Sequence, residues 1–240
     1  MTNEIVLVGF YFLALLYAVI LHEVSHGVVA LWLGDMTAKY AGRLNLSPFS
    51  HIDILGSIII PVTLFLTTGF AFGYAKPVPY NPANLRDQKW GSLKVALAGP
   101  ASNFLFALLT ALLAALLPMT MLEKAEILKR FYGVIGGGEF LDRFQALAVA
   151  MSGSLPHIIF GLAILFIFWN VVLGCFNLIP IPPLDGSKIL YALFPISERT
   201  QILVEQYGFF LLLLLVVLFS GPIWAITSFF LQFFFGLALA

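Results

Sequence analysis

The sequence predicts an all-helical protein that crosses a membrane about five to six times. Of its 240 residues, 61% are hydrophobic and only 10% are charged, whereas a soluble domain carries about 25% charged residues. The mean hydropathy is +1.01, and apolar runs long enough to span a bilayer recur along the chain. We therefore expect a single integral membrane domain over residues 1–240.

Five apolar segments account for the expected membrane spans. They are residues 5–33, 54–72, 93–117, 157–176 and 207–240. The first should stop at Gly34 and Asp35, and the last should break into two helices at Gly221-Pro222. The second contains Pro61 in its middle. We expect residues 5–194 to form the functional core, followed by the C-terminal helices.

The connections between these segments are short, which leaves no room for a separate soluble domain. Residues 35–49, DMTAKYAGRLNLSPF, are interpreted as a short pair of strands. Residues 69–82, GFAFGYAKPVPYNP, have the Gly, Pro and aromatic content of an extended segment. Residues 123–144 carry mixed charges at helical spacing and three consecutive glycines, so we expect an interfacial helix and a loop there.

The composition also excludes several classes of protein. Basic and acidic residues balance at twelve each, and no basic patch with interleaved aromatics is present, so nucleic acid is not expected as a partner. Cys175 is the only cysteine, which excludes an internal disulfide and a cysteine-cluster metal site. The N-terminal apolar run lacks a basic leader and a cleavage site, and is interpreted as a retained membrane helix.

The stretch LHEVSHG contains three ionisable side chains inside an apolar helix. His22 and His26 are four residues apart and share a helix face, and Glu23 lies about 100° round from His22. This HExxH pattern offers two nitrogen ligands for Zn²⁺ and a carboxylate that can act on metal-bound water. There are two alternatives: these residues are polar side chains at the rim of a helix, or they form a proton relay in a transporter. Because ionisable groups within a membrane span are costly, we favour a metal site with one zinc ion per chain.

A catalytic zinc site requires a third protein ligand and an open position. The candidates beside apolar segments are His51, Asp53, His157, Cys175 and Asp185. We favour Asp185, because the prolines at 180, 182 and 183 must unwind the chain next to it. Unwound backbone at membrane depth is tolerated where protein or a water-filled cavity lines it. Capping or turn roles are favoured for His51, Asp53 and His157, and a small buried side chain for Cys175.

Three motifs occur in the order LHEVSHG, AGPASNF and GCFNLIPIPPLDGSKIL, and together they closely resemble the site-2 protease family of intramembrane zinc metalloproteases. The resemblance extends over residues 19–190. It implies His22, His26 and Asp185 as zinc ligands, Glu23 as the general base and acid, and Asn177 as a support for the scissile carbonyl. The stretches SPFSHIDILG and FGYAKPVPYNP resemble a compact prokaryotic branch of this family, which lacks PDZ-type and nucleotide-sensing domains.

The order of the motifs constrains the topology. If residues 54–72 cross the membrane fully, Asp185 reaches the face opposite the two histidines. If they are re-entrant, Asp185 reaches the same face. The basic residues then divide into eight on the face of the metal (Lys39, Arg43, Lys76, Arg86, Lys89, Lys94, Lys188 and Arg199) and four on the other (Lys124, Lys129, Arg130 and Arg143). A full crossing divides them evenly. By the positive-inside rule we predict a re-entrant segment, an N-terminus outside and a metal site nearer the cytoplasm of a prokaryotic cell.

The expected function is hydrolysis of peptide bonds in or near transmembrane segments of membrane-protein substrates, as in regulated intramembrane proteolysis. A membrane metal-ion transporter is one alternative, but it has no need of a glutamate directly after the first histidine and often shows an internal repeat. A non-catalytic membrane binding protein is another, and it would tolerate loss of Glu23. The lipid bilayer is the expected environment, and the oligomeric state does not follow from these patterns.

Overall fold

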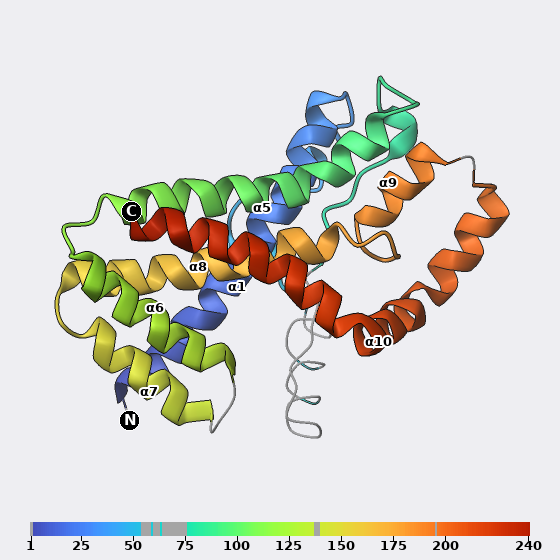
Figure 1. Cartoon of the computed structure of the whole chain (residues 1–240). Coiled ribbons are helices and arrows are strands. Elements are labelled where there is room, and N and C mark those ends of the chain that lie inside the picture. The colour runs from blue at the N-terminus through green and yellow to red at the C-terminus, as the bar shows by residue number, and fades with distance from the viewer. Residues whose placement is uncertain (1, 54–58, 60–62, 64–75, 137–139, 195) are drawn as a thin grey trace. The chain divides into compact units, whose positions relative to one another are not determined.

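The computed structural model describes residues 2–53, 59, 63, 76–136, 140–194 and 196–240, and in these ranges it is helical without β-strands. Figure 1 shows the course of the chain. The helices are α1 (Thr2–Trp32), α2 (Thr37–Tyr40), α3 (Pro48–His51), the 3-10 turn η2 (Pro82–Asn84), α5 (Gly91–Ala115), α6 (Met121–Gly136), α7 (Phe140–Met151), α8 (Leu155–Asn177), α9 (Gly186–Leu193) and α10 (Glu198–Leu239).

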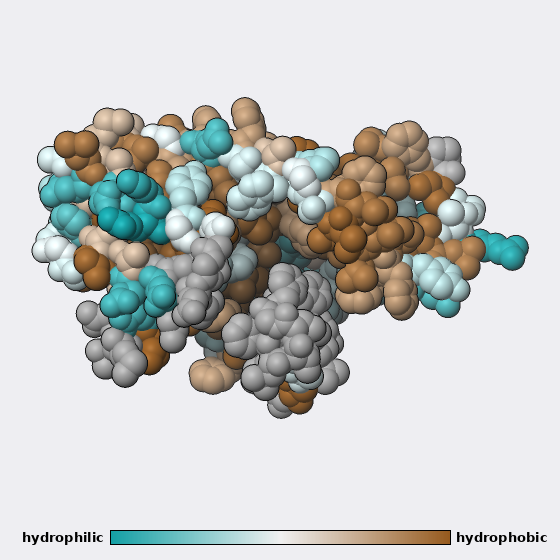
Figure 2. Space-filling view, turned by 60° about the horizontal axis from the view of Figure 1, so that its bottom comes forward, coloured by the Kyte–Doolittle hydropathy of each residue, from teal (hydrophilic) through white to brown (hydrophobic). Residues whose placement is uncertain are grey.

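Within the described part of the chain, four helices are long and apolar enough to cross a membrane. They comprise Glu4–Trp32, Gly91–Ala115, Leu155–Asn177 and Arg199–Leu239. Four of the five expected segments therefore form such helices, and most of the fifth, residues 54–72, lies outside the described residues. Large apolar side chains are exposed along α1, α5, α8 and α10, and Figure 2 shows broad apolar areas on the face that it presents. An apolar exterior of this kind is suited to lipid.

Local chemistry explains where the helices begin and end. Gly34 has φ 108°, and the hydrogen bonds Gly34 N to Leu31 O and Asp35 N to Ala30 O form a Schellman motif that ends α1. This is the predicted stop. At the start of α6, the Thr120 N–H donates to Glu123 Oε2 at 2.7 Å and the Glu123 N–H donates to Thr120 Oγ1 at 3.3 Å. That reciprocal pair is a capping box.

Helix α10 bends where the sequence predicted a break. Phe219 has non-helical dihedral angles, φ −121° and ψ 22°, and Pro222 lies inside the helix. Pro222 lacks an N–H and its ring crowds the carbonyl four residues earlier, so the distortion falls at Phe219 rather than at Gly221. The helical assignment continues through the kink, and α10 begins nine residues before the predicted start at Tyr207.

The expected strand pair at residues 35–49 is wrong. Asp35 Oδ1 accepts hydrogen bonds from the N–H and the hydroxyl of Thr37, at 3.2 and 2.6 Å, and a helical turn follows. A second turn begins at Pro48, a residue suited to the first helical position. Side-chain hydrogen bonds of this local kind compete with strand pairing. Residues 76–80, in the expected extended segment, form neither helix nor strand, so the predicted short β element is not seen in the described part of the chain.

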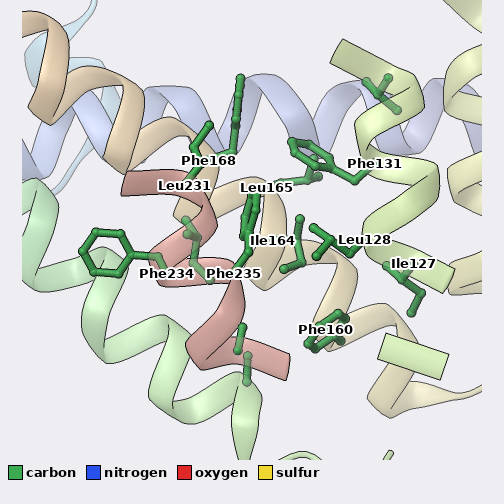
Figure 3. Close-up of a cluster of buried hydrophobic side chains, with 14 of the residues drawn as sticks. Ile127, Leu128, Phe131, Phe160, Ile164, Leu165, Phe168, Leu231, Phe234 and Phe235 are labelled. Atoms are coloured by element: carbon green, nitrogen blue, oxygen red, sulfur yellow. The ribbon is translucent and has the colours of Figure 1, made fainter. Parts of the chain in front are cut away.

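The chain forms two compact units. The first comprises residues 1–18, 103–176 and 213–240, and the second comprises residues 19–102 and 177–212. The first unit has a large apolar core in which α6, α8 and α10 contribute aromatic and aliphatic side chains that point toward one another (Figure 3). Phe131, Phe160 and Phe235 are fully buried there. The second unit has a smaller cluster of Ala30, Leu85 and Val95.

A buried polar pair joins three helices of the first unit. Asn103 of α5 and Asn170 of α8 are each 0% exposed. Asn103 Nδ2 donates to Asn170 Oδ1 at 2.9 Å and to the carbonyl of Ala18 in α1 at 3.2 Å. Asn170 Nδ2 in turn donates to the Phe166 carbonyl at 2.9 Å. Because lipid offers no alternative partners, such bonds fix how membrane helices align.

Replacing Asn103 with alanine should lower the free energy of unfolding by about 1–2 kcal/mol, because Asn170 Oδ1 loses its donor in an apolar interior. Thermal or denaturant unfolding in detergent micelles measures the change. Gln232→Ala, at an exposed position of α10, is the control and should have little effect. An Asn103→Ala protein as stable as the wild type would show that the pair does not stabilise the unit.

Candidate metal centre

Three ligand-type side chains converge in the second unit. His22 and His26 lie on one face of α1 and are only 6% and 9% exposed. Asp185, which precedes α9, lies with its Oδ2 atom 3.0 Å from His22 Nε2 and 3.3 Å from His26 Nε2. Across residues 2–53, 76–136, 140–194 and 196–240, these are the only His, Cys, Asp or Glu side chains grouped closely enough to share a metal ion.

The turn that delivers Asp185 follows the end of α8 at Asn177. Hydrogen bonds between residues close in sequence, from Ile181 N to Ile179 O and from Leu184 N to Ile181 O, fold the proline-rich stretch. A Cβ added at Gly186 would collide with the carbonyl oxygens of Leu178 and Ile179. Glycine at this position therefore allows α9 to start directly against the end of α8, which brings the preceding aspartate back to the histidines.

Helix α5 supplies one wall of the site from its backbone. His26 Nδ1 lies 2.7 Å from the carbonyl oxygen of Val95. Donation from Nδ1 to this carbonyl fixes the ring and leaves the lone pair of Nε2 for a metal, as is usual for ligating histidines. A Cβ added at Gly99 would lie 2.5 Å from Nε2 of both His22 and His26. Gly99 therefore leaves open the space that the two imidazoles share.

The donor set fits zinc. Asp185 Oδ2 is buried without a hydrogen-bond donor, although it faces two imidazole nitrogens at 3.0 and 3.3 Å. When both imidazoles are neutral with their lone pairs on Nε2 and the carboxylate is ionised, these lone pairs face one another, and a cation between them removes the repulsion. In a tetrahedral site with bonds of about 2.0–2.1 Å, ligand atoms lie roughly 3.3 Å apart. Two nitrogens and one carboxylate oxygen at this spacing leave a fourth position for water or substrate.

Two further residues of interest lie in this unit. Glu23 follows His22 on α1, and its Oε2 atom accepts a hydrogen bond from the backbone N–H of Val78 at 2.8 Å. Asn177 is the last residue of α8 and is half-buried. Its role as a support for the scissile carbonyl stays a prediction.

The other candidate ligands have different partners. The His51 side chain is buried, and its Nε2 lies 2.8 Å from the Asn45 carbonyl oxygen. His157 Nδ1 lies 2.7 Å from Ser154 Oγ at the start of α8. Asp53 is half-buried two residues after α3. Cys175 packs against the apolar core of the first unit.

Sequence reasoning missed the contributions of Gly99 and Val95. The motif AGPASNF contributes to the family resemblance, but its residues carry no predicted role in the site. One signal was available, because glycine followed by proline inside a membrane helix is unfavourable for the helix itself and indicates a close approach of backbone. The Val95 contact uses a main-chain carbonyl, so no side-chain pattern could indicate it.

The membrane helices and the His-His-Asp group, with a glutamate beside the first histidine, define a membrane metalloprotease of the zinc type. Residues 10–215 match the model of Peptidase family M50. The chain is 33% identical over 222 residues to "Putative zinc metalloprotease YwhC" of Bacillus subtilis (strain 168). The aligned region covers 90% of this chain and 84% of that protein. The chain is 27% identical over 204 residues to "Putative zinc metalloprotease Rip2" of Mycolicibacterium smegmatis, covering 84% of this chain and 64% of that protein.

No solved structure matches the chain. Because the family model covers most of its length, the chain belongs to peptidase family M50, the site-2 protease family. The predicted family is therefore confirmed.

Replacing Gly99 with alanine should reduce zinc affinity by about 10–100-fold, the range found when groups that orient metal ligands are changed. The added methyl group would occupy the space between the two imidazoles. Zinc content after purification in detergent, and zinc retention against a graded chelator, measure the loss. Gly9→Ala is the matched control on α1, since a Cβ there meets no atom within 4 Å. Equal zinc retention in both variants would contradict the role of Gly99.

Proposed function

We propose that this protein is an intramembrane zinc endopeptidase that cleaves peptide bonds in or near transmembrane segments of membrane proteins, as in regulated intramembrane proteolysis. The observation that carries the proposal is that Asp185, before α9, meets His22 and His26 of the apolar helix α1, with Glu23 next to the first histidine. Membership of family M50 supports the same conclusion.

Each residue has a defined task in this proposal. The two histidines and Asp185 would hold one zinc ion, which when bound lowers the pKa of water and polarises a carbonyl. Glu23 would take the proton of the attacking water and pass it to the leaving amine, so that it acts first as base and then as acid. Asn177 would donate a hydrogen bond to the carbonyl oxygen of the scissile bond as negative charge develops. The substrate helix must unwind locally, because its carbonyls are otherwise bonded within the helix.

We also propose that residues 54–72 are re-entrant and that the metal lies nearer the cytoplasm. The contacts on either side of this segment support the proposal. Asp35, just after α1, accepts hydrogen bonds from Asn81 N at 2.7 Å and Asn84 Nδ2 at 2.9 Å. The chain before and after the apolar segment thus meets at the same end of α1. The greater number of basic residues assigned to this face supports a cytoplasmic location.

Replacing Glu23 with glutamine should leave zinc bound and lower cleavage about 10²–10⁴-fold, the usual contribution of a general acid–base group. The test uses purified wild type and variant in detergent, with zinc analysis and a single-span membrane substrate. Cleavage that survives in Glu23→Gln would exclude the proposed role of Glu23. Zinc flux across vesicles without cleavage by the wild type would favour a transporter, and neither activity would favour a binding protein.

Cysteines introduced singly at Met36 and Ala83, both exposed, should react with a membrane-impermeant thiol reagent from the same face in a Cys175→Ser background. A cysteine at Leu122, 82% exposed, should react from the opposite face and is the control. The measurement is labelling of intact cells against labelling of inverted vesicles. Labelling of positions 36 and 83 from opposite faces would mean that residues 54–72 cross the membrane.

A further inference from the structure

The side chain of Glu23 is held by a part of the chain far from it in sequence. The Val78 N–H donates to Glu23 Oε2 at 2.8 Å. Val78 lies between Pro77 and Pro79, and proline has no backbone N–H. Val78 therefore carries the only main-chain donor of residues 77–79, and that donor is directed at Glu23.

Residues 76–81, which we name the strap, are fixed at both ends. At the first end, Arg43 Nη2 donates to the Lys76 carbonyl at 2.6 Å, and the Lys76 N–H donates to the His51 carbonyl at 3.0 Å. At the second end, the Asn81 N–H donates to Asp35 Oδ2 at 2.7 Å. The donor between these ends is therefore held in place independently of Glu23.

The second anchor of the strap is a buried carboxylate. Asp35 is 0% exposed. Burial raises the pKa of Asp35, but hydrogen bonds from Thr37, Asn84 and Asn81 outweigh burial and hold the pKa below its usual value. Asp35 therefore stays ionised at neutral pH, which strengthens its hydrogen bond to the strap.

The strap packs directly on the face of α1 that carries Glu23. Gly27 lies four residues after Glu23 and so on the same helix face. A Cβ added at Gly27 would lie 2.8 Å from Cγ1 of Val78, and the Val78 side chain is only 6% exposed. The missing side chain at position 27 lets the strap approach the helix closely enough for its N–H to reach the carboxylate.

We propose that the Val78 main-chain N–H is a positioning group of the active site, which orients the general base Glu23. The inference rests on the proposed function, because it requires Glu23 to accept the proton of water. With Oε2 bound to Val78, the carboxylate is confined to one orientation and the second oxygen remains for the proton. A glutamate without this partner samples several rotamers, and misplacement of a reacting group by about 1 Å can cost about 100-fold in rate.

Proline makes the strap suitable for this task. Each proline fixes its own φ, and Pro79 restricts Val78 to extended conformations. The strap therefore loses little conformational entropy when it is ordered, and its single N–H has a fixed direction. The Pro-Val-Pro sequence also leaves no neighbouring N–H to compete for the carboxylate.

The test compares Val78→Pro with Val78→Ala. Both replace the branched valine side chain, but only proline removes the N–H, and Pro79 already imposes an extended backbone on this position. We expect kcat of Val78→Pro to be about 10–100-fold below that of Val78→Ala, with equal KM and equal zinc content. Equal kcat in the two variants, or a higher kcat in Val78→Pro, would overturn the proposal. Absence of cleavage by the wild type would instead overturn the proposed function.

A second variant covers the case in which Val78→Pro does not fold. Arg43→Ala removes the donor to the Lys76 carbonyl and leaves the Val78 N–H in place. We expect a lower kcat with KM and zinc content preserved, because the strap is loosened at one end. Unchanged kcat in Arg43→Ala would also count against the strap.

Hydrogen exchange gives a readout that does not require activity. Because residues 77 and 79 have no N–H, exchange at the centre of the strap reports on the Val78 amide alone. In zinc-free protein, Glu23→Ala should accelerate exchange of the Val78 amide, separated from that of Tyr80 by overlapping peptides, at least about 10-fold, because the amide loses its acceptor. Peptides from α6 are the internal control. Unchanged exchange at Val78 would overturn the proposal.

Discussion

The second unit depends on one electrostatic constraint, the convergence of three lone-pair donors in a buried, largely apolar setting. His22, His26 and Asp185 come from parts of the chain more than 150 residues apart, and a cation bound between them would offset the cost of burying three polar groups together. The surrounding structure serves to bring them together and to fix their orientation. The Val95 carbonyl sets the orientation of His26, and the proline-rich turn after α8 returns Asp185 to α1.

Main-chain atoms form much of this site, and glycines leave space in it because they have no side chain. A Cβ at Gly99 would collide with the two histidines, one at Gly186 with the preceding turn, and one at Gly27 with the strap. Membrane helices commonly approach one another through small residues, since lipid provides no hydrophobic force to bring them together. In this unit, glycines likewise allow the backbone to lie close to the histidines, the turn and the strap. The two units differ in this respect, because the first is held by large aromatic side chains such as Phe131 and Phe235.

The sequence predicted the parts of the structure that follow from periodicity and from ligand chemistry. Hydropathy located four long helices, and HExxH with the proline-unwound Asp185 predicted which side chains would meet. The prediction of a strand pair at residues 35–49 was wrong because Asp35 and Pro48 favour helical turns. These turns depend on local contacts that a β-propensity pattern does not contain. The bond between Glu23 and Val78 joins residues 55 positions apart through a main-chain atom. Neither periodicity nor spacing encodes a contact of that kind.

The composition of the donor set has a consequence for the environment in which the protein can work. Two imidazole nitrogens and a carboxylate oxygen include no sulfur, and the single thiol of the chain, Cys175, packs in the apolar core of the first unit. Oxidants that convert thiolate ligands to sulfenic or sulfinic acids therefore have no target among these three side chains. Protons do compete for all three donors. A metal held by these three side chains would be released by acid, while oxidants that attack thiolates would leave its donors unchanged.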